Sequence, residues 1–222
     1  MGKLIVLEGT DGSGKSTQFG LLKKRLEQDG TAFRTIVFPQ YSEESSALIR
    51  MYLSGAFGSH PRDVNAYAAS TFYAVDRFAA YQRQWGEDYR RGLPILSDRY
   101  TTSNAVHQGA KLPEKEQEEF FRWLYDLEFH RFGLPKPDLV LYLDMPTEMT
   151  EKLMRSREAV THTNADIHEK DLDYLKLCRE TGLKAACYYG WHVVSCVRRK
   201  SLRTVDDINE ELYRLVKKAM ED

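Results

Sequence analysis

The strongest constraint on this chain is a glycine-rich segment near its amino terminus, Gly9-Thr10-Asp11-Gly12-Ser13-Gly14-Lys15-Ser16-Thr17. It matches the pattern G-x-x-x-x-G-K-[ST], with a strand-like apolar run before it and a helix-like segment after it. Glycines allow the backbone to curl with its N–H groups pointing inward, and the helix that follows adds the positive end of its dipole. The segment is therefore predicted to cradle phosphate oxygens. Lys15 is expected to reach the β- and γ-phosphates of a nucleoside triphosphate, and the Ser16 hydroxyl to hold Mg²⁺.

Short apolar runs alternate with segments of helical periodicity along the chain. The runs are too short for helices, and they cover residues 3–8, 33–38, 94–97, 139–143 and 192–197. Helical periods extend from Lys15 to Gly30, over residues 62–91 and 113–132, and along a stripe from Val205 to Ala219. This alternation predicts an α/β fold, the P-loop NTPase fold, with a five-stranded parallel sheet and helices on both faces. Ligands of such sheets bind beyond the carboxyl ends of the strands.

Composition favours a single folded domain over residues 1–222. The chain is 42% hydrophobic and 29% charged, which excludes a disordered polypeptide. Its net charge of −1 gives no general attraction to nucleic acid or to an anionic membrane, and no apolar run approaches the ~20 residues of a membrane span. No leader pattern precedes the first strand, and the three cysteines have neither disulfide nor zinc spacing. We therefore expect a cytoplasmic protein with no nucleic-acid partner and no membrane partner.

A phosphate loop indicates a nucleoside triphosphate but leaves the reaction open. GTPases, ATP-driven motors and small-molecule kinases all use such loops. No N-K-x-D element for guanine recognition is present, and the chain is short for a motor that must move a further module. A kinase for a small acceptor is favoured.

Charged residues expected at the same mouth of the sheet narrow the chemistry. Asp98 follows the third strand, where a carboxylate could hold Mg²⁺, and Arg99 beside it would face the same crevice. Arg155 and Arg157 precede a polar segment that we interpret as part of a mobile lid, roughly residues 155–169. These two arginines could clamp a transferring phosphoryl group as its charge develops. Alternatively, they are cations that favour a helix C-terminus.

The end of the second strand bears on the nucleophile. A hydroxyl acceptor usually needs a carboxylate base, whereas a phosphate monoester, with a second pKa near ~6, is already nucleophilic at pH 7. This strand ends Phe38-Pro39-Gln40-Tyr41, without an acidic residue at its tip, which favours a monophosphate acceptor. Glu43 and Glu44 lie close enough to leave a hydroxyl acceptor open.

With these motifs together, the chain resembles the thymidylate kinases, P-loop nucleoside monophosphate kinases that convert dTMP to dTDP. The resemblance is carried by residues 9–17, by Phe38-Pro39, by Phe72-Tyr73-Ala74-Val75-Asp76-Arg77 and by Asp98-Arg99-Tyr100-Thr101-Thr102-Ser103-Asn104. Weaker similarity continues through Asp144-Met145-Pro146 into the lid, so it covers nearly the whole chain. It implies ATP as the phosphoryl donor, Mg²⁺ as cofactor, the small molecule dTMP as acceptor, and a homodimer.

The resemblance also implies roles for individual residues. Asp11 would lie near the phosphate and the sugar hydroxyl of the acceptor, and Arg99 would bind its phosphate. Tyr73 would lie under the thymine ring, where stacking suits any base because every base has a π-face. Arg77 would bond an exocyclic oxygen of the base, and Asn104 its pyrimidine edge. The further residues expected to bind substrate are Phe38, His107 and Gln108.

Members of this family differ in where their catalytic arginine lies. Gly12 stands where some members have an arginine in the phosphate loop, so the resemblance assigns the transition-state role to Arg155 or Arg157 and places the chain in the lid-arginine type. Asp166 and Glu169 match an acidic pair of the lid. The expected catalytic residues are Lys15, Asp11, Arg99, Arg155 and Arg157.

Two positions depart from the family pattern. Gln40 stands where many members have an arginine after Phe-Pro, and Arg50 on the following helix could replace that contact. His107 replaces a tyrosine that abuts the sugar and helps to reject a 2′-hydroxyl. A kinase of another pyrimidine nucleotide or of a deoxynucleoside therefore stays open, as does a nucleotide-binding regulatory protein without turnover.

Overall fold

The computed structural model describes residues 1–150, 172–199 and 201–221. Five strands form one sheet in the order β2-β3-β1-β4-β5, and every pairing is parallel, as predicted. The strands are β1 (Leu4–Gly9), β2 (Arg34–Val37), β3 (Ile95–Asp98), β4 (Leu139–Asp144) and β5 (His192–Ser195). The register pairs Leu7 with Asp98 and Gly9 with Leu143. The carboxyl ends of three strands therefore meet around the segment that follows Gly9.

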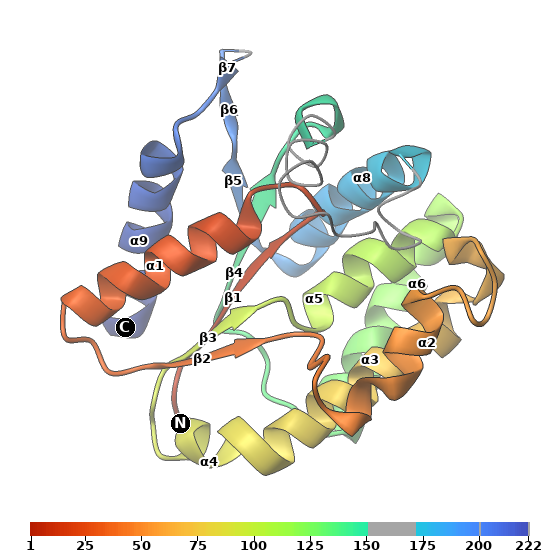
Figure 1. Ribbon diagram of the computed structural model, residues 1–222, viewed down its shortest axis with the longest axis horizontal. Coiled ribbons are helices and arrows are strands. Elements are labelled where there is room, and N and C mark those ends of the chain that lie inside the picture. The colour runs from red at the N-terminus through yellow and green to blue at the C-terminus, as the bar shows by residue number, and fades with distance from the viewer. Residues whose placement is uncertain (151–171, 200, 222) are drawn as a thin grey trace.

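Successive residues of β1 point to opposite faces of the sheet and enter two different cores. Ile5 and Leu7 lie in the core that is covered by α1 (Lys15–Gln28) and α9 (Val205–Glu221). Leu4 and Val6 lie in the other core, which is covered by several helices, among them α3 (Ala66–Ala80), α6 (Glu114–Tyr125) and α8 (Leu172–Tyr189). Figure 1 shows α1 and α9 on one side of the sheet and these helices on the other. The predicted covering of both faces is confirmed.

Wide helical turns interrupt the long helices that the periodicity predicts. Over residues 62–91, the chain forms a 3₁₀ turn (Pro61–Asp63), then α3, a π-helical turn (Tyr81–Trp85) and α4 (Gly86–Arg90). Over residues 113–132, α6 passes into a second π-helical turn (Asp126–Arg131). A third one (Asn104–Gln108) follows α5 (Thr101–Ser103). A π turn adds a residue without ending the helix, so an apolar pattern continues across it and does not reveal it.

The other elements are short. A 3₁₀ turn (Glu44–Ser46) leads into α2 (Ala47–Leu53), and another (Gly109–Lys111) precedes α6. The predicted last strand over residues 192–197 ends at Ser195, because its partner β4 ends at the residue it pairs with there, Asp144. An antiparallel hairpin of β6 (Val197–Arg198) and β7 (Ser201–Leu202) follows.

The predicted lid lies outside the described residues, and with it Arg155, Arg157, Asp166 and Glu169. None of the described helices combines the length and the apolar character that a membrane span requires.

Candidate active site

The phosphate loop connects the end of β1 to the first residue of α1, Lys15. Gly12 and Gly14 have φ angles of 75° and 83°, a left-handed conformation that side chains other than glycine rarely adopt. At Gly9, a Cβ atom would lie 2.6 Å from Ser13 Oγ, so glycine allows the curl to close. Ser13 Oγ is buried and has no hydrogen-bond partner among the described residues. A buried hydroxyl that lacks a partner fits a loop whose ligand supplies oxygen acceptors.

Lys15 and Asp98 form a buried ion pair at this loop. Lys15 Nζ donates to Asp98 Oδ1 at 2.8 Å, across the junction of α1 and β3. Burial lowers the pKa of Lys15, and the nearby charge of Arg99 lowers it further, while Asp98 opposes both effects. Asp98 does not fully offset the cost of burying the charged ammonium group of Lys15. A negatively charged phosphate ligand would therefore stabilise it. Lys15, which is predicted to bind phosphate, and Asp98, which is predicted to hold Mg²⁺, thus lie together at this edge of the sheet.

Arg99 occupies a strained backbone position directly after β3. Its φ angle is 67°, which costs about 1–3 kcal/mol for a residue other than glycine and is typical of functional sites. Its Nη2 donates to Asp11 Oδ1 at 2.5 Å, and its Nη1 lies 3.2–3.3 Å from Glu8 Oε1, Gly9 O, Ser103 Oγ and His107 Nε2. Burial by itself would lower the pKa of Arg99, but the negative charges of Asp11 and Glu8 outweigh this effect, and the pKa is raised. The guanidinium group is therefore a fixed positive charge beside the phosphate loop.

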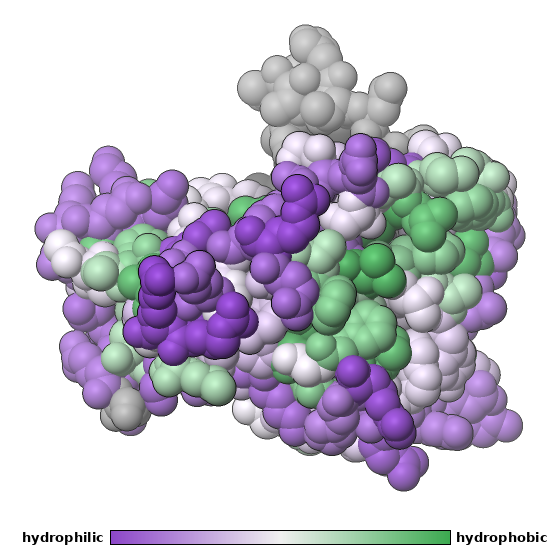
Figure 2. Space-filling view, turned by 90° about the horizontal axis from the view of Figure 1, so that it is seen from below, coloured by the Kyte–Doolittle hydropathy of each residue, from purple (hydrophilic) through white to green (hydrophobic). Residues whose placement is uncertain are grey.

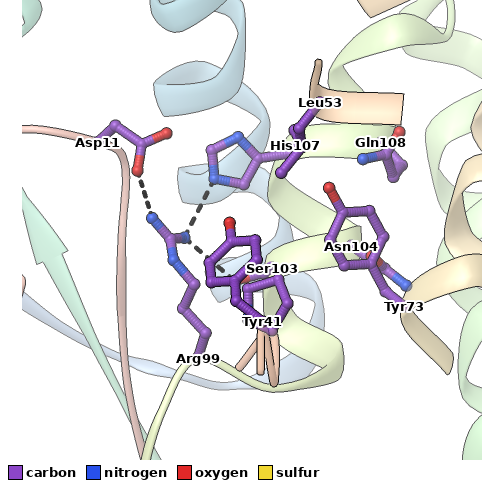
Figure 3. A pocket seen from close by; sticks show the side chains of 10 residues that line it. Asp11, Tyr41, Leu53, Tyr73, Arg99, Ser103, Asn104, His107 and Gln108 are labelled. Atoms are coloured by element: carbon purple, nitrogen blue, oxygen red, sulfur yellow. Dashed lines mark hydrogen bonds and ion pairs between the residues drawn. The ribbon is translucent and has the colours of Figure 1, made fainter. Parts of the chain in front are cut away.

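A pocket opens next to Arg99. Figure 3 shows Asp11 and Arg99 at one end and Tyr73, Asn104 and Gln108 at the other. The residues that line it are Asp11, Pro39, Tyr41, Leu53, Tyr73, Arg99, Ser103, Asn104, His107 and Gln108. Four of them, Ser103, Asn104, His107 and Gln108, come from the end of α5 and the π turn that follows it. π turns often occur at functional sites, and here one presents Asn104, His107 and Gln108 to the same cavity.

Most of the predicted substrate-binding residues line this pocket, but two do not. Phe38 is buried and packs against Tyr100, with ring centroids 6.0 Å apart. Arg77 is buried in an ion pair with Glu128, and its Nη1 lies 3.4 Å from Tyr100 O. Their contacts with substrate stay predictions.

The pocket also contains residues that the sequence analysis does not name as site residues. Pro39 and Ser103 are part of the motifs quoted there, and their position next to named residues is a signal that could have identified them. Tyr41 follows Pro39 by two residues. Leu53 ends α2, and nothing in the local pattern distinguishes it from a core leucine.

The loop after β2 is held by its own polar contacts. Gln40 donates from its backbone N–H to Asp76 Oδ2 at 2.9 Å and from its side-chain Nε2 to Val37 O at 2.7 Å. Arg50 Nη1 bonds Tyr41 O, Glu43 O and Ser46 Oγ, so this side chain braces the loop. Glu43 and Glu44, the two carboxylates considered as a base for a hydroxyl acceptor, are not among the described residues that line the pocket.

A parallel α/β sheet carries a phosphate loop after its central strand, and a polar pocket shares Asp11 with that loop and contacts it through Arg99. These features define the class of P-loop phosphotransferases. The thymidylate kinase family model matches residues 7–208. The chain belongs to the thymidylate kinase family.

Individual relatives agree with this assignment. The thymidylate kinase of Mycobacterium tuberculosis (strain H37Rv) is 34% identical over 173 residues, which are 77% of this chain and 79% of the relative. A probable thymidylate kinase of Pyrobaculum aerophilum is 29% identical over 213 residues, 96% of this chain and 97% of the relative. Among solved structures, thymidylate kinase from Candida albicans superposes with a TM-score of 0.69 over 98% of this chain and 92% of its own, at 23% identity. The last comparison establishes the fold.

Proposed function

We propose that this chain transfers the γ-phosphoryl group of ATP to dTMP and releases ADP and dTDP. The observation that carries the proposal is the position of Arg99. It contacts Asp11 of the phosphate loop on one side and the pocket residues Ser103 and His107 on the other. A monophosphate bound at Arg99 would lie next to the site where the loop holds the γ-phosphate. Membership in the thymidylate kinase family supports dTMP as the acceptor.

The chemistry needs positioning and charge neutralisation rather than a covalent intermediate. An acceptor phosphate attacks without a base, and Lys15 and Arg99 would bind the charged oxygens on the two sides of the transferred group. Mg²⁺, when bound, neutralises charge on the β- and γ-phosphates; Ser16 and Asp98 are the residues that would hold it. Such an ion usually takes only one or two carboxylates from the protein, and Asp98 would supply one.

The far end of the pocket suits a pyrimidine. Tyr73 and Leu53 provide an aromatic and an apolar wall, while Asn104 and Gln108 provide amide groups. Gln108 Oε1 is buried and has no partner among the described residues, which leaves it available to accept a bond from a base. Asn104 Nδ2 donates to Ser70 O at 3.1 Å, so this contact fixes its amide. The proposal keeps Arg155 or Arg157 as the transition-state arginine, and a cytoplasmic location.

A homodimer through α2 and α3 is also proposed. On α3, Val75 and Phe78 are one turn apart, and their exposed fractions are 50% and 38%. On α2, Leu48 and Met51 have the same spacing and are exposed as well. Figure 2 shows the molecule from below, relative to the view of Figure 1. Hydrophobic residues gather toward the middle and right of this face. Light scattering should give a dimer for the wild type and a monomer for Val75→Glu. Val205→Glu, on α9 and outside the proposed interface, is the control and should stay a dimer. A monomeric wild type would contradict this part.

The main test is ADP release with ATP and Mg²⁺ across dTMP, dUMP, dCMP, UMP, AMP and thymidine. We expect dTMP to be turned over fastest. Preference for another monophosphate would keep the mechanism and change the base assignment. Turnover with thymidine alone would overturn the phosphate nucleophile, and tight ATP binding without acceptor-dependent ADP release would indicate a regulatory protein.

A further inference from the structure

Glu8 is a fully buried carboxylate that the proposed mechanism does not use. It stands near the end of β1, immediately before the phosphate loop, and its exposed fraction is 0%. Oε1 accepts from the amide of Gly9 at 2.9 Å and from Arg99 Nη1 at 3.2 Å. Oε2 accepts from Thr102 Oγ1 at 2.6 Å and from Ser103 Oγ at 2.7 Å. One side chain thus joins the start of the phosphate loop, Arg99 and helix α5.

Burial of a carboxylate costs several kcal/mol unless charges and hydrogen bonds compensate it. The four donors around Glu8 provide this compensation. Glu8 is not among the described residues that line the pocket, so its contacts are directed at other protein groups. A role in holding those groups therefore fits its position better than contact with a ligand.

The surroundings of Arg99 show which group needs to be held. Its Nη1 carries two hydrogens but has four acceptors at 3.2–3.3 Å, and Glu8 is the charged one among them. On the other side, Asp11 attracts Nη2 at 2.5 Å. Glu8 balances this attraction and also fixes Ser103, a second contact of Arg99. Without Glu8, Nη1 would lose its charged acceptor, and Asp11 would be the remaining carboxylate among the described contacts that hold the guanidinium group.

We propose that Glu8 is a positioning residue that orients Arg99 toward the phosphate of the acceptor. This rests on the proposed function, because it assigns the acceptor phosphate to Arg99. Arg99 is the charged group that Glu8 holds beside the pocket, so most of the effect of Glu8 on the acceptor should disappear when Arg99 is removed.

The test is a double-mutant cycle of Glu8→Gln and Arg99→Ala, with kcat/KM for dTMP and calorimetric binding of dTMP measured in all four proteins. Glu8→Gln should lower both about ten-fold or more, the size expected for a lost charge-assisted contact, and change KM for ATP less than about two-fold. In the Arg99→Ala background, Glu8→Gln should change them less than about two-fold. An equal loss in both backgrounds would overturn the proposal, because a merely structural role does not depend on Arg99.

A second pair of variants covers the case in which Glu8→Gln does not fold. Thr102→Val removes a donor to Glu8, and Thr181→Val removes a buried hydroxyl of α8 that bonds Gln117 instead. Thr102→Val should raise KM for dTMP and Thr181→Val should leave it unchanged; equal effects would overturn the proposal. A wild type that consumes no nucleoside monophosphate would overturn the proposed function itself. If it prefers another monophosphate, the same cycle is run with that acceptor.

Discussion

Arg77 and Glu128 form a two-point ion pair in the interior, where their side chains are 2% and 0% exposed. Arg77 Nε donates to Glu128 Oε2 at 2.6 Å, and Nη2 donates to Oε1 at 2.5 Å. Thr101 Oγ1 adds a third bond to the same carboxylate at 2.7 Å. With Nη1 donating to Tyr100 O at 3.4 Å, all three nitrogens of Arg77 are engaged, and its guanidinium plane is fixed before any substrate binds.

This pair predicts a large loss of stability when one partner is removed. Glu128→Gln leaves the Arg77 cation buried without a counter-charge and should lower the free energy of unfolding by about 3 kcal/mol, measured in urea. The double variant Arg77→Met with Glu128→Leu should recover most of that loss, because it removes both charges. Asp126→Asn breaks the exposed pair with Arg131 in the same π turn and is the control that should change little. Equal losses in Glu128→Gln and Asp126→Asn would contradict the burial argument.

Substitution by alanine is expected to change the stability of the protein in opposite directions at two helical glycines, Gly182 and Gly20. At Gly182 in α8, an added Cβ would lie 2.3 Å from the hydroxyl of Tyr142, so the packing forbids a side chain. Overpacking costs about 1–3 kcal/mol, which exceeds the ~1 kcal/mol that alanine gains over glycine in a helix. Gly182→Ala should therefore destabilise the protein in thermal or urea unfolding.

Gly20 is the matched control for this prediction. It is exposed in α1, and nothing lies within 4 Å of an added Cβ. Gly20→Ala should stabilise the protein by up to about 1 kcal/mol. Stabilisation by both substitutions would mean that α8 and Tyr142 rearrange readily.

Features that depend on local sequence could be predicted here. The phosphate loop is defined by residues next to one another, and the strands by short apolar runs, so the parallel sheet and the residues at its carboxyl ends follow from the chain. Lys15 and Asp98 lie 83 residues apart, yet strand ends that meet at one edge bring them together.

Features that depend on pairing in the interior could not be predicted. Glu8 lies at the end of an apolar run, where a carboxylate is usually exposed to solvent, and three of its four donors come from a distant segment that only the fold brings near. Glu128 looks like one more charge on an amphipathic helix, and its partner Arg77 lies 51 residues away. The π turn at Asn104–Gln108 leaves no mark on the apolar period, so its wide geometry could not be predicted, although its pocket residues Asn104, His107 and Gln108 were.

Removal of the Lys15 side chain is expected to abolish catalysis while the protein still folds. Lys15→Ala removes the cation for the transferred phosphate and should lower kcat at least about 100-fold. Loss of Lys15 removes one partner of the buried pair with Asp98 and should lower stability, but Asp98 keeps the nearby charge of Arg99, so the variant should still fold. Lys23→Ala, on the exposed side of α1 where it pairs with Glu27, is the control and should keep full activity. Near-normal ADP release by Lys15→Ala would contradict the assignment of the phosphate loop.

Because His107 is buried, the stability of the protein is expected to fall as the pH is lowered. Burial lowers its pKa to about 4; Asp11 opposes this and the charge of Arg99 adds to it. In the unfolded chain its pKa is about 6.5, so between these two values the unfolded state binds more protons and stability falls as the pH falls. The loss attributable to His107 between pH 7 and pH 4 is about 3 kcal/mol. His107→Gln lacks this titration, and other groups cancel in the comparison. The unfolding free energy of the wild type should therefore fall relative to that of His107→Gln as the pH is lowered from 7 to 4 in urea titrations. A difference that stays constant over this range would show that His107 is protonated as readily in the folded protein as in the unfolded chain, and would remove the neutral imidazole from the contacts of Arg99.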